Sequence, residues 1–113
     1  MSHMIDFTTI GTDITSDITW AETPLSAQAT LILGNYVLIN YMGDSRTHAV
    51  GQNIATVPAE YKPAANTFTP CGYGGNIGNV VLQAADGKIN CNATFGGATD
   101  SSRANFTLLY KIA

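Results

Sequence analysis

One polar stretch of the chain carries most of the side chains that could take part in chemistry. Residues 43–48 contain Asp44, Arg46 and His48, and Tyr41 comes shortly before them. A carboxylate, a guanidinium, an imidazole and an aromatic ring in one short loop can bind a saccharide. Sugars offer hydroxyl groups to planar polar groups and C–H faces to aromatic rings, and such sites are commonly built on loops. The stretch is therefore a candidate saccharide site.

The same residues also have a plainer interpretation, in which Tyr41 packs in the core and Arg46 pairs with Asp44 on the surface. Two further aromatic residues are candidates for the saccharide site. Tyr73 lies in a glycine-dense segment that we expect to be a loop. Trp20, the only tryptophan, is either a platform for a ligand or a lid on one end of the core, and we favour the lid.

The sequence does not predict an enzyme. Ser45 lies in the same polar loop, but a catalytic triad must be assembled in space rather than along the chain. Glycosidase chemistry needs two carboxylates across a sugar, and neither Glu22 nor Glu60, the only glutamates, has an evident partner. Neither Cys71 nor Cys91 has a second cysteine or histidine at metal-ligand spacing. We expect a non-enzymatic protein with no metal and no cofactor.

Composition narrows both function and fold. Only 12% of the residues are charged, against about 25% in ordinary soluble domains, while 45% are hydrophobic. Five Lys and Arg and a net charge of −3 argue against nucleic acid as a partner. The sequence contains no apolar run of about 18 residues, so we expect no insertion into a membrane. Low charge is also typical of a domain that covers part of its surface in an oligomer, since interface cores are depleted in charge.

The chain has the length of one domain with a single modest core. Residues 1–4 match a cloning scar, residues 5–27 read as an N-terminal arm with short strands, and residues 28–113 read as a β-sandwich domain. Two cysteines are too few for a disulfide scaffold. We predict that Cys71 and Cys91 are buried thiols rather than a bridge.

Two strand patterns flank the turn signal Gly34-Asn35. Residues 29–33 and 36–42 form either a hairpin or one long strand with a bulge at Gly34. Both faces of residues 36–42 are largely apolar, which predicts a central strand covered on both sides.

A second hairpin is predicted around Asp86-Gly87. With a two-residue turn, Leu82 opposes Cys91 and Val80 opposes Ala93. Cross-strand partners share a face. The predicted apolar face consists of Val80, Leu82, Ala84, Ile89, Cys91 and Ala93.

Alternation is cleanest near the end of the chain. From residue 103 to 112 the predicted inward side chains are Ala104, Phe106, Leu108, Tyr110 and Ile112. With strands at short regular spacing and no helical period, the sequence predicts an all-β fold, an antiparallel β-sandwich of jelly-roll type.

Two prolines shape the segment from residue 54 to 63. Pro58 and Pro63 each have a fixed φ and favour extended geometry in the preceding residue. We therefore expect Val57 and Lys62 to be extended, and residues 59–61 to form a bend between two strands.

This segment resembles a crossover found in the tip domains of bacteriophage tail and baseplate proteins. Its Ile-Ala-Thr-Val-Pro, followed by x-x-Tyr-Lys-Pro, is similar to the pattern IATLPxGYRP of those families. A glycine-rich loop, a hairpin like residues 80–89 and an aromatic-rich last strand follow here as they do there. The resemblance covers residues 35–113. Two departures are Ala59-Glu60, where glycine is usual, and Lys62, where arginine is usual.

The resemblance implies a trimeric β-sandwich head domain at the tip of a tail fibre or baseplate, in a phage of Gram-positive bacteria. Such a protein folds in the cytoplasm of the bacterial host and is carried on the virion. There it is a receptor-binding protein that attaches to host cell-wall or surface polysaccharide. Related domains are structural adapters that contact other baseplate and tail proteins. A third interpretation, a lectin-like or tumour-necrosis-factor-like domain of a non-viral protein, shares the fold.

Overall fold

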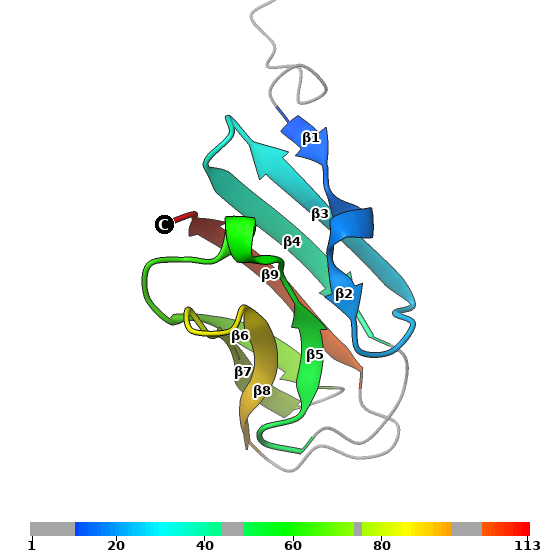
Figure 1. Cartoon of the computed structure of the whole chain (residues 1–113). Helices are drawn as coiled ribbons and strands as arrows, with labels where there is room; N and C mark the ends of the chain where they lie inside the picture. Colours follow the sequence, from blue (N-terminus) through cyan, green and yellow to red (C-terminus); the bar gives the residue numbers. More distant parts are fainter. Residues whose placement is uncertain (1–10, 44–48, 74–75, 96–102) are drawn as a thin grey trace, which may run out of the picture.

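Nine strands and two short 3-10 helices make up the computed structural model, which describes residues 11–43, 49–73, 76–95 and 103–113 (Figure 1). The helices are η1 (Thr15–Asp17) and η2 (Ala59–Tyr61). All nine strands pair antiparallel, in the order β1-β3-β4-β9-β6-β7-β8-β5-β2. The predicted all-β antiparallel class is confirmed. The strands are β1 (Gly11–Asp13), β2 (Thr19–Trp20), β3 (Ser26–Ile32), β4 (Tyr36–Met42), β5 (Asn53–Thr56), β6 (Thr67–Tyr73), β7 (Asn76–Leu82), β8 (Lys88–Phe95) and β9 (Ala104–Lys111).

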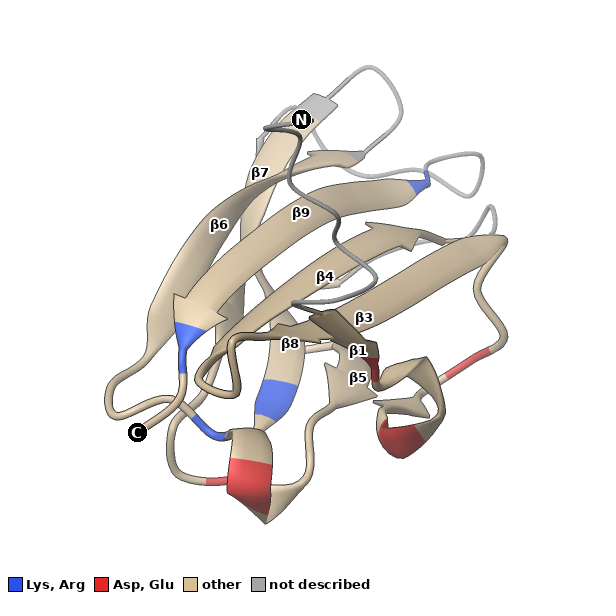
Figure 2. Cartoon of the chain, turned by 90° about the horizontal axis from the view of Figure 1, so that it is seen from above, with Lys and Arg blue, Asp and Glu red and all other residues tan. Residues whose placement is uncertain are grey.

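The sheet is curled, so that the half formed by β3, β4 and β9 faces the half formed by β5 and β8 (Figures 1 and 2). The two halves join along a short seam between β9 and β6. Within these strands, only the pairs Gly72–Asn105 and Tyr73–Ala104 are in register there. Beyond the strands, Pro63 and Ile112 form an isolated bridge. The result resembles a sandwich with one open corner.

A strap joins the two edges of the curled sheet, on the side opposite the seam between β9 and β6. We use this name for residues 11–20, which comprise β1, η1 and β2. β1 pairs with β3 at one end of the strand order, and β2 pairs with β5 at the other end. Between them Ile14 and Ile18 are buried in the core. The N-terminal residues therefore contribute to the same core as residues 28–113.

The core lies between the two halves and follows the strand alternation. β9 alternates strictly between buried and exposed residues from Ala104 to Lys111, as the sequence predicts. Cys71 and Cys91 are buried and are not joined by a disulfide, which agrees with the prediction of two thiols. The described part of the chain contains no helix long and apolar enough to cross a membrane.

β3 and β4 form a hairpin, so the alternative of one bulged strand is wrong. Ile32 pairs with Tyr36, and Leu33 and Gly34 both have positive φ, 54° and 77°, as a tight hairpin turn requires. The prediction that β4 is covered on both sides is not met in the single chain. Val37, Ile39 and Tyr41 are buried. The other face of β4 is largely open, since no segment that the structure describes covers it.

The β7–β8 hairpin is present, but its predicted register is wrong by two residues. Leu82 pairs with Ile89 and Val80 with Cys91. The turn is longer than two residues because the Gly87 amide donates to the Gln83 carbonyl at 2.9 Å. A shift of two residues preserves which side chains share a face. Of the predicted apolar face, Val80, Leu82, Ile89 and Cys91 are therefore still buried, whereas Ala84 and Ala93 are only half-buried.

The proline segment forms the expected crossover from β5 to β6. η2 makes the bend at residues 59–61, and Lys62 after it is extended, with φ −69° and ψ 142°. The prediction that the glycine-dense segment is a loop is wrong for its first residues. Gly72 and Tyr73 belong to β6, because their backbones pair both with β7 and with β9.

Candidate functional site

The predicted loop residues Asp44, Arg46 and His48 lie outside the described residues, so their role stays a prediction. Tyr73 is the last residue of β6 rather than part of a loop, and its side chain is not described.

Tyr41 is a core residue, as the plainer interpretation expects. It is only 8% exposed. Its ring stacks on Phe106, with centroids 5.1 Å apart, and on Trp20, with centroids 5.8 Å apart. Burial raises the pKa of the Tyr41 hydroxyl above its usual range, so the group stays neutral. Trp20 is partly buried against the same core, which agrees with the lid interpretation.

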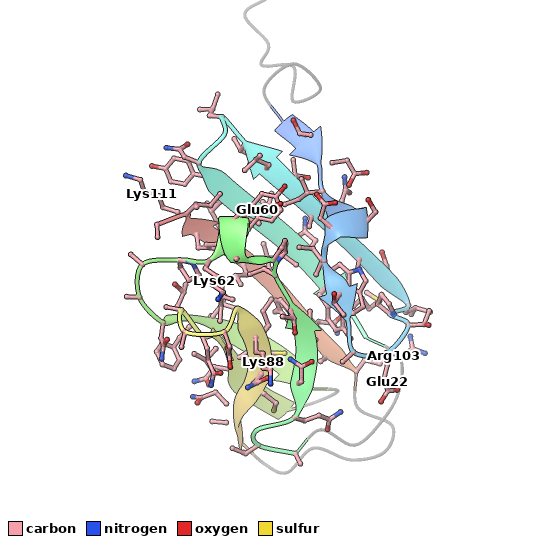
Figure 3. The ribbon with its side chains drawn as sticks, in the orientation of Figure 1. Glu22, Glu60, Lys62, Lys88, Arg103 and Lys111 are labelled. Carbon is pink, nitrogen blue, oxygen red and sulfur yellow. The ribbon has the colours of Figure 1, made fainter. Side chains whose placement is uncertain are left out.

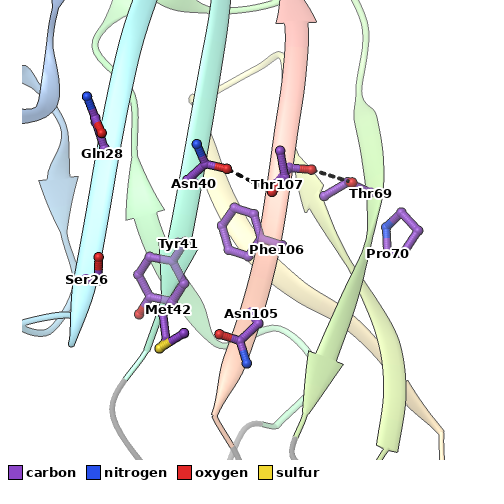
Figure 4. Close-up of a pocket in the computed structure, with 10 residues that line it drawn as sticks. All are labelled: Ser26, Gln28, Asn40, Tyr41, Met42, Thr69, Pro70, Asn105, Phe106 and Thr107. Carbon is purple, nitrogen blue, oxygen red and sulfur yellow. Dashed lines mark hydrogen bonds between the residues drawn. The ribbon is translucent and has the colours of Figure 1, made fainter.

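A different surface offers room for a ligand. A hollow of about 610 Å³ crosses the outer face of β3, β4, β9 and β6 (Figure 4). We call it the sheet groove. Its lining consists of Ser26, Gln28, Asn40, Tyr41, Met42, Thr69, Pro70, Asn105, Phe106 and Thr107.

Strand register gathers the polar lining from distant parts of the chain. Gln28 pairs with Asn40, and Asn40 pairs with Thr107. Two residues further along β4, Met42 pairs with Ser26 on one side and with Asn105 on the other. Cross-strand partners share a face, and Ile39 and Leu108 beside them point into the core. These polar side chains therefore all lie on the outer face.

The hollow lies where the ladder between β6 and β9 stops. Pro70 has no N–H to donate, and no strand pair joins β6 to β9 on the Pro70 side of Gly72. The carbonyl of Thr107 accepts a hydrogen bond from the hydroxyl of Thr69 at 3.0 Å instead. The proline thus accounts for the local gap between the two halves of the sheet.

Hydrogen bonds fix the orientation of the central amide of the groove. The hydroxyl of Thr107 donates to Oδ1 of Asn40 at 2.9 Å (Figure 4). The Nδ2 group of Asn40 is consequently turned toward Gln28, where it can donate to a ligand. The side-chain nitrogen of Asn105 donates to the Arg103 carbonyl at 3.5 Å, which leaves its oxygen as an acceptor.

The lining of the sheet groove contains no charged residue among those that the structure describes. The described charged side chains come from strand ends, turns and the two short helices, as the colours of Figure 2 and the labels of Figure 3 show. They are Asp13, Asp17, Glu22, Glu60, Lys62, Asp86, Lys88, Arg103 and Lys111. These described lining residues can bind through uncharged hydrogen bonds and apolar contact.

Among the residues that the structure describes, no group of three or more His, Cys, Asp and Glu is placed to hold a metal ion. Sequence reasoning missed the sheet groove altogether. The signal in the sequence was the set of outward polar residues in three strands, with Ser26 and Gln28 in β3, Asn40 in β4, and Asn105 and Thr107 in β9, and that signal requires the strand pairing to be known. Asn40 and Thr107 are 67 positions apart in the chain.

No protein-family model matches this chain, and comparison with curated proteins also gives no match.

Proposed function

We propose that this protein is a non-enzymatic binding module that holds a saccharide in the sheet groove. The observation that carries the proposal is the lining of side-chain amides and hydroxyls, with the Asn40 amide held in one orientation by Thr107. A sugar hydroxyl both donates and accepts hydrogen bonds, and a side-chain amide offers one group of each kind.

The dimensions support the same proposal. A volume of about 610 Å³ falls within the roughly 300–1,000 Å³ of typical small-molecule sites. The groove lies on strands rather than on loops, so its side chains are held by the pairing of the sheet. A fixed set of uncharged groups loses little conformational freedom when a ligand binds.

The sequence resemblance suggests a biological setting for this activity. In that setting the protein is the tip domain of a phage tail fibre or baseplate and adsorbs to a polysaccharide of the host surface. The predicted loop residues Asp44, Arg46 and His48 follow Met42, which lines one end of the groove. Their contact with the saccharide stays a prediction from the sequence.

Binding to a glycan array and to host envelope preparations tests the proposal. Replacing Asn40 with alanine should weaken binding roughly 2–13-fold, since one uncharged hydrogen bond contributes about 0.5–1.5 kcal/mol. Asn35→Ala is the matched control, because Asn35 is also exposed but lies in the β3–β4 turn outside the groove. No binding to any glycan or envelope preparation would refute the proposal, and so would equal effects of the two variants.

A structural role as a trimerising or adapter module is the second candidate, and a specific observation favours it. The outer face also carries exposed apolar side chains: Tyr36 is 38% exposed, Met42 41% and Leu109 59%. Exposed apolar side chains gathered on one face are typical of interaction surfaces. Light scattering combined with the glycan array distinguishes the candidates, since this role predicts a trimer that is indifferent to saccharides. A monomer at micromolar concentration would count against this role and against the phage-tip setting alike.

A further inference from the structure

A second hollow continues the sheet groove toward β7. It has a volume of about 260 Å³ and is lined by Phe68, Thr69, Pro70, Ile77, Gly78 and Asn79. Thr69 and Pro70 line both hollows. The two hollows therefore adjoin at β6, and we call them together the extended groove.

The two parts of the extended groove differ in chemistry. The part over β3, β4 and β9 presents amides and hydroxyls, as described above. The part over β6 and β7 presents Phe68, which is 57% exposed, and Ile77, which is 67% exposed. An exposed aromatic ring beside a row of hydrogen-bonding groups is the combination that a sugar chain requires, since its rings have C–H faces and its edges have hydroxyls.

The length of the extended groove indicates the size of the ligand. It crosses five neighbouring strands, β3, β4, β9, β6 and β7. Neighbouring paired strands lie about 4.8 Å apart, so the three paired intervals alone account for roughly 14 Å, and the gap between β9 and β6 adds to this length. This distance is several times the width of one sugar ring and suits an oligosaccharide rather than a monosaccharide.

The charge of the lining indicates the class of saccharide. None of the described residues that line the two hollows is charged. An acidic polysaccharide would lose the hydration of its carboxylates or phosphates here, with no cation among these lining residues to compensate. A neutral chain has no such cost.

From these observations we infer that the extended groove binds a neutral oligosaccharide chain that runs across the strands, with one sugar ring stacked on Phe68. This inference rests on the proposed saccharide-binding function and specifies the ligand of the same site. Phe68 supplies the apolar contact at the β6–β7 end, and Asn40 supplies oriented hydrogen bonds at the centre.

Calorimetric titrations with neutral oligosaccharides of increasing length test the inference. The probes are the maltose, cellulose and galactan series, from disaccharide to hexasaccharide, with galacturonate oligomers as the acidic counterpart. We expect the affinity for one neutral series to rise with length and to be insensitive to salt. Phe68→Ala should weaken binding of its longest members about tenfold and leave its disaccharide unchanged.

Leu33→Ala is the matched control, because Leu33 is an exposed apolar residue at the β3–β4 turn, outside both hollows. Circular dichroism melting checks that both variants fold. Binding that depends on Asn40 but not on length or Phe68 would overturn the inference and leave the proposed function standing. Tighter binding of the acidic oligomers would also overturn it. If Phe68→Ala instead dissociates an oligomer of the free protein, Phe68 belongs to a subunit interface and the inference is wrong. If none of these oligosaccharides and no glycan of the array binds, the proposed function falls with it.

Discussion

Replacing Gly87 with alanine should destabilise the fold much more than the same change at Gly34. Both glycines have positive φ, 74° and 77°, so both variants lose about 1–2 kcal/mol from backbone conformation. The surroundings differ. A Cβ atom on Gly87 would lie 2.5 Å from the carbonyl oxygen of Val57 and 3.2 Å from its Cγ2, whereas a Cβ on Gly34 would meet nothing within 4 Å.

The steric conflict at Gly87 is hard to relieve. The obstructing atom belongs to the backbone, and Val57 is only 1% exposed. The amide of Val57 also donates to the Gly87 carbonyl at 2.9 Å, so moving the turn away would break this hydrogen bond. Overpacking in a core typically costs 1–3 kcal/mol. We therefore expect a total loss of about 2–5 kcal/mol for Gly87→Ala and about 1–2 kcal/mol for Gly34→Ala.

Urea unfolding followed by Trp20 fluorescence measures both losses. The difference between the two variants isolates the contact of the β7–β8 turn with Val57, since the backbone cost is shared. Equal losses in free energy of unfolding would refute the placement of this turn against the end of β5. Gly72→Ala provides a further reference, because a Cβ there meets nothing within 4 Å and its φ is not positive.

Three further predictions concern the core. Tyr110→Phe should lower the free energy of unfolding by about 1–2 kcal/mol in chemical denaturation, because the buried hydroxyl donates to the Tyr61 carbonyl at 2.7 Å; an unchanged value would contradict this contact. Burial raises the pKa of Tyr110 above its unfolded value near 10, so its contribution to stability is complete below about pH 10 and is lost as the pH rises toward the folded pKa. Stability measured against pH should therefore fall above about pH 10, and less steeply in Tyr110→Phe. Cys71 and Cys91 should react with a thiol reagent only as fast as the protein unfolds, and rapid labelling of the native protein would show that they are not buried.

Much of the fold follows from local patterns in the sequence. The alternation in β9 predicts which of its side chains are buried, because the strand has one face on the core. The predicted register of the β7–β8 hairpin was wrong by two residues, since the turn around Gly87 is longer than two residues. Four of the six residues predicted on the buried face are nevertheless buried, because faces repeat with a period of two.

The contacts that could not be predicted are those between distant segments. Gly72 looked like part of a loop, because its pairing with Ile77 and Asn105 depends on how three strands meet. The strap was equally hidden. Ile14 and Ile18 stand in a segment of irregular pattern, and their burial depends on the two ends of the sheet lying close together.

The sheet groove illustrates the same limit at the candidate site. The sequence directed attention to a polar loop, since clustered charged and aromatic residues are a local signal. The groove instead depends on Asn40 and Thr107, which meet only after β4 and β9 pair. Tyr41, which the sequence left open between ligand and core, is placed in the core by its stacking on Phe106 and Trp20.

The most direct test of the saccharide site is an amide NMR titration of the protein with a neutral oligosaccharide that binds on the array. Binding in the sheet groove predicts the largest shift changes at Asn40, Met42, Asn105 and Thr107, all of which line it. Changes that avoid these residues and gather around the strap near Trp20 would contradict the account, and so would a spectrum that does not change.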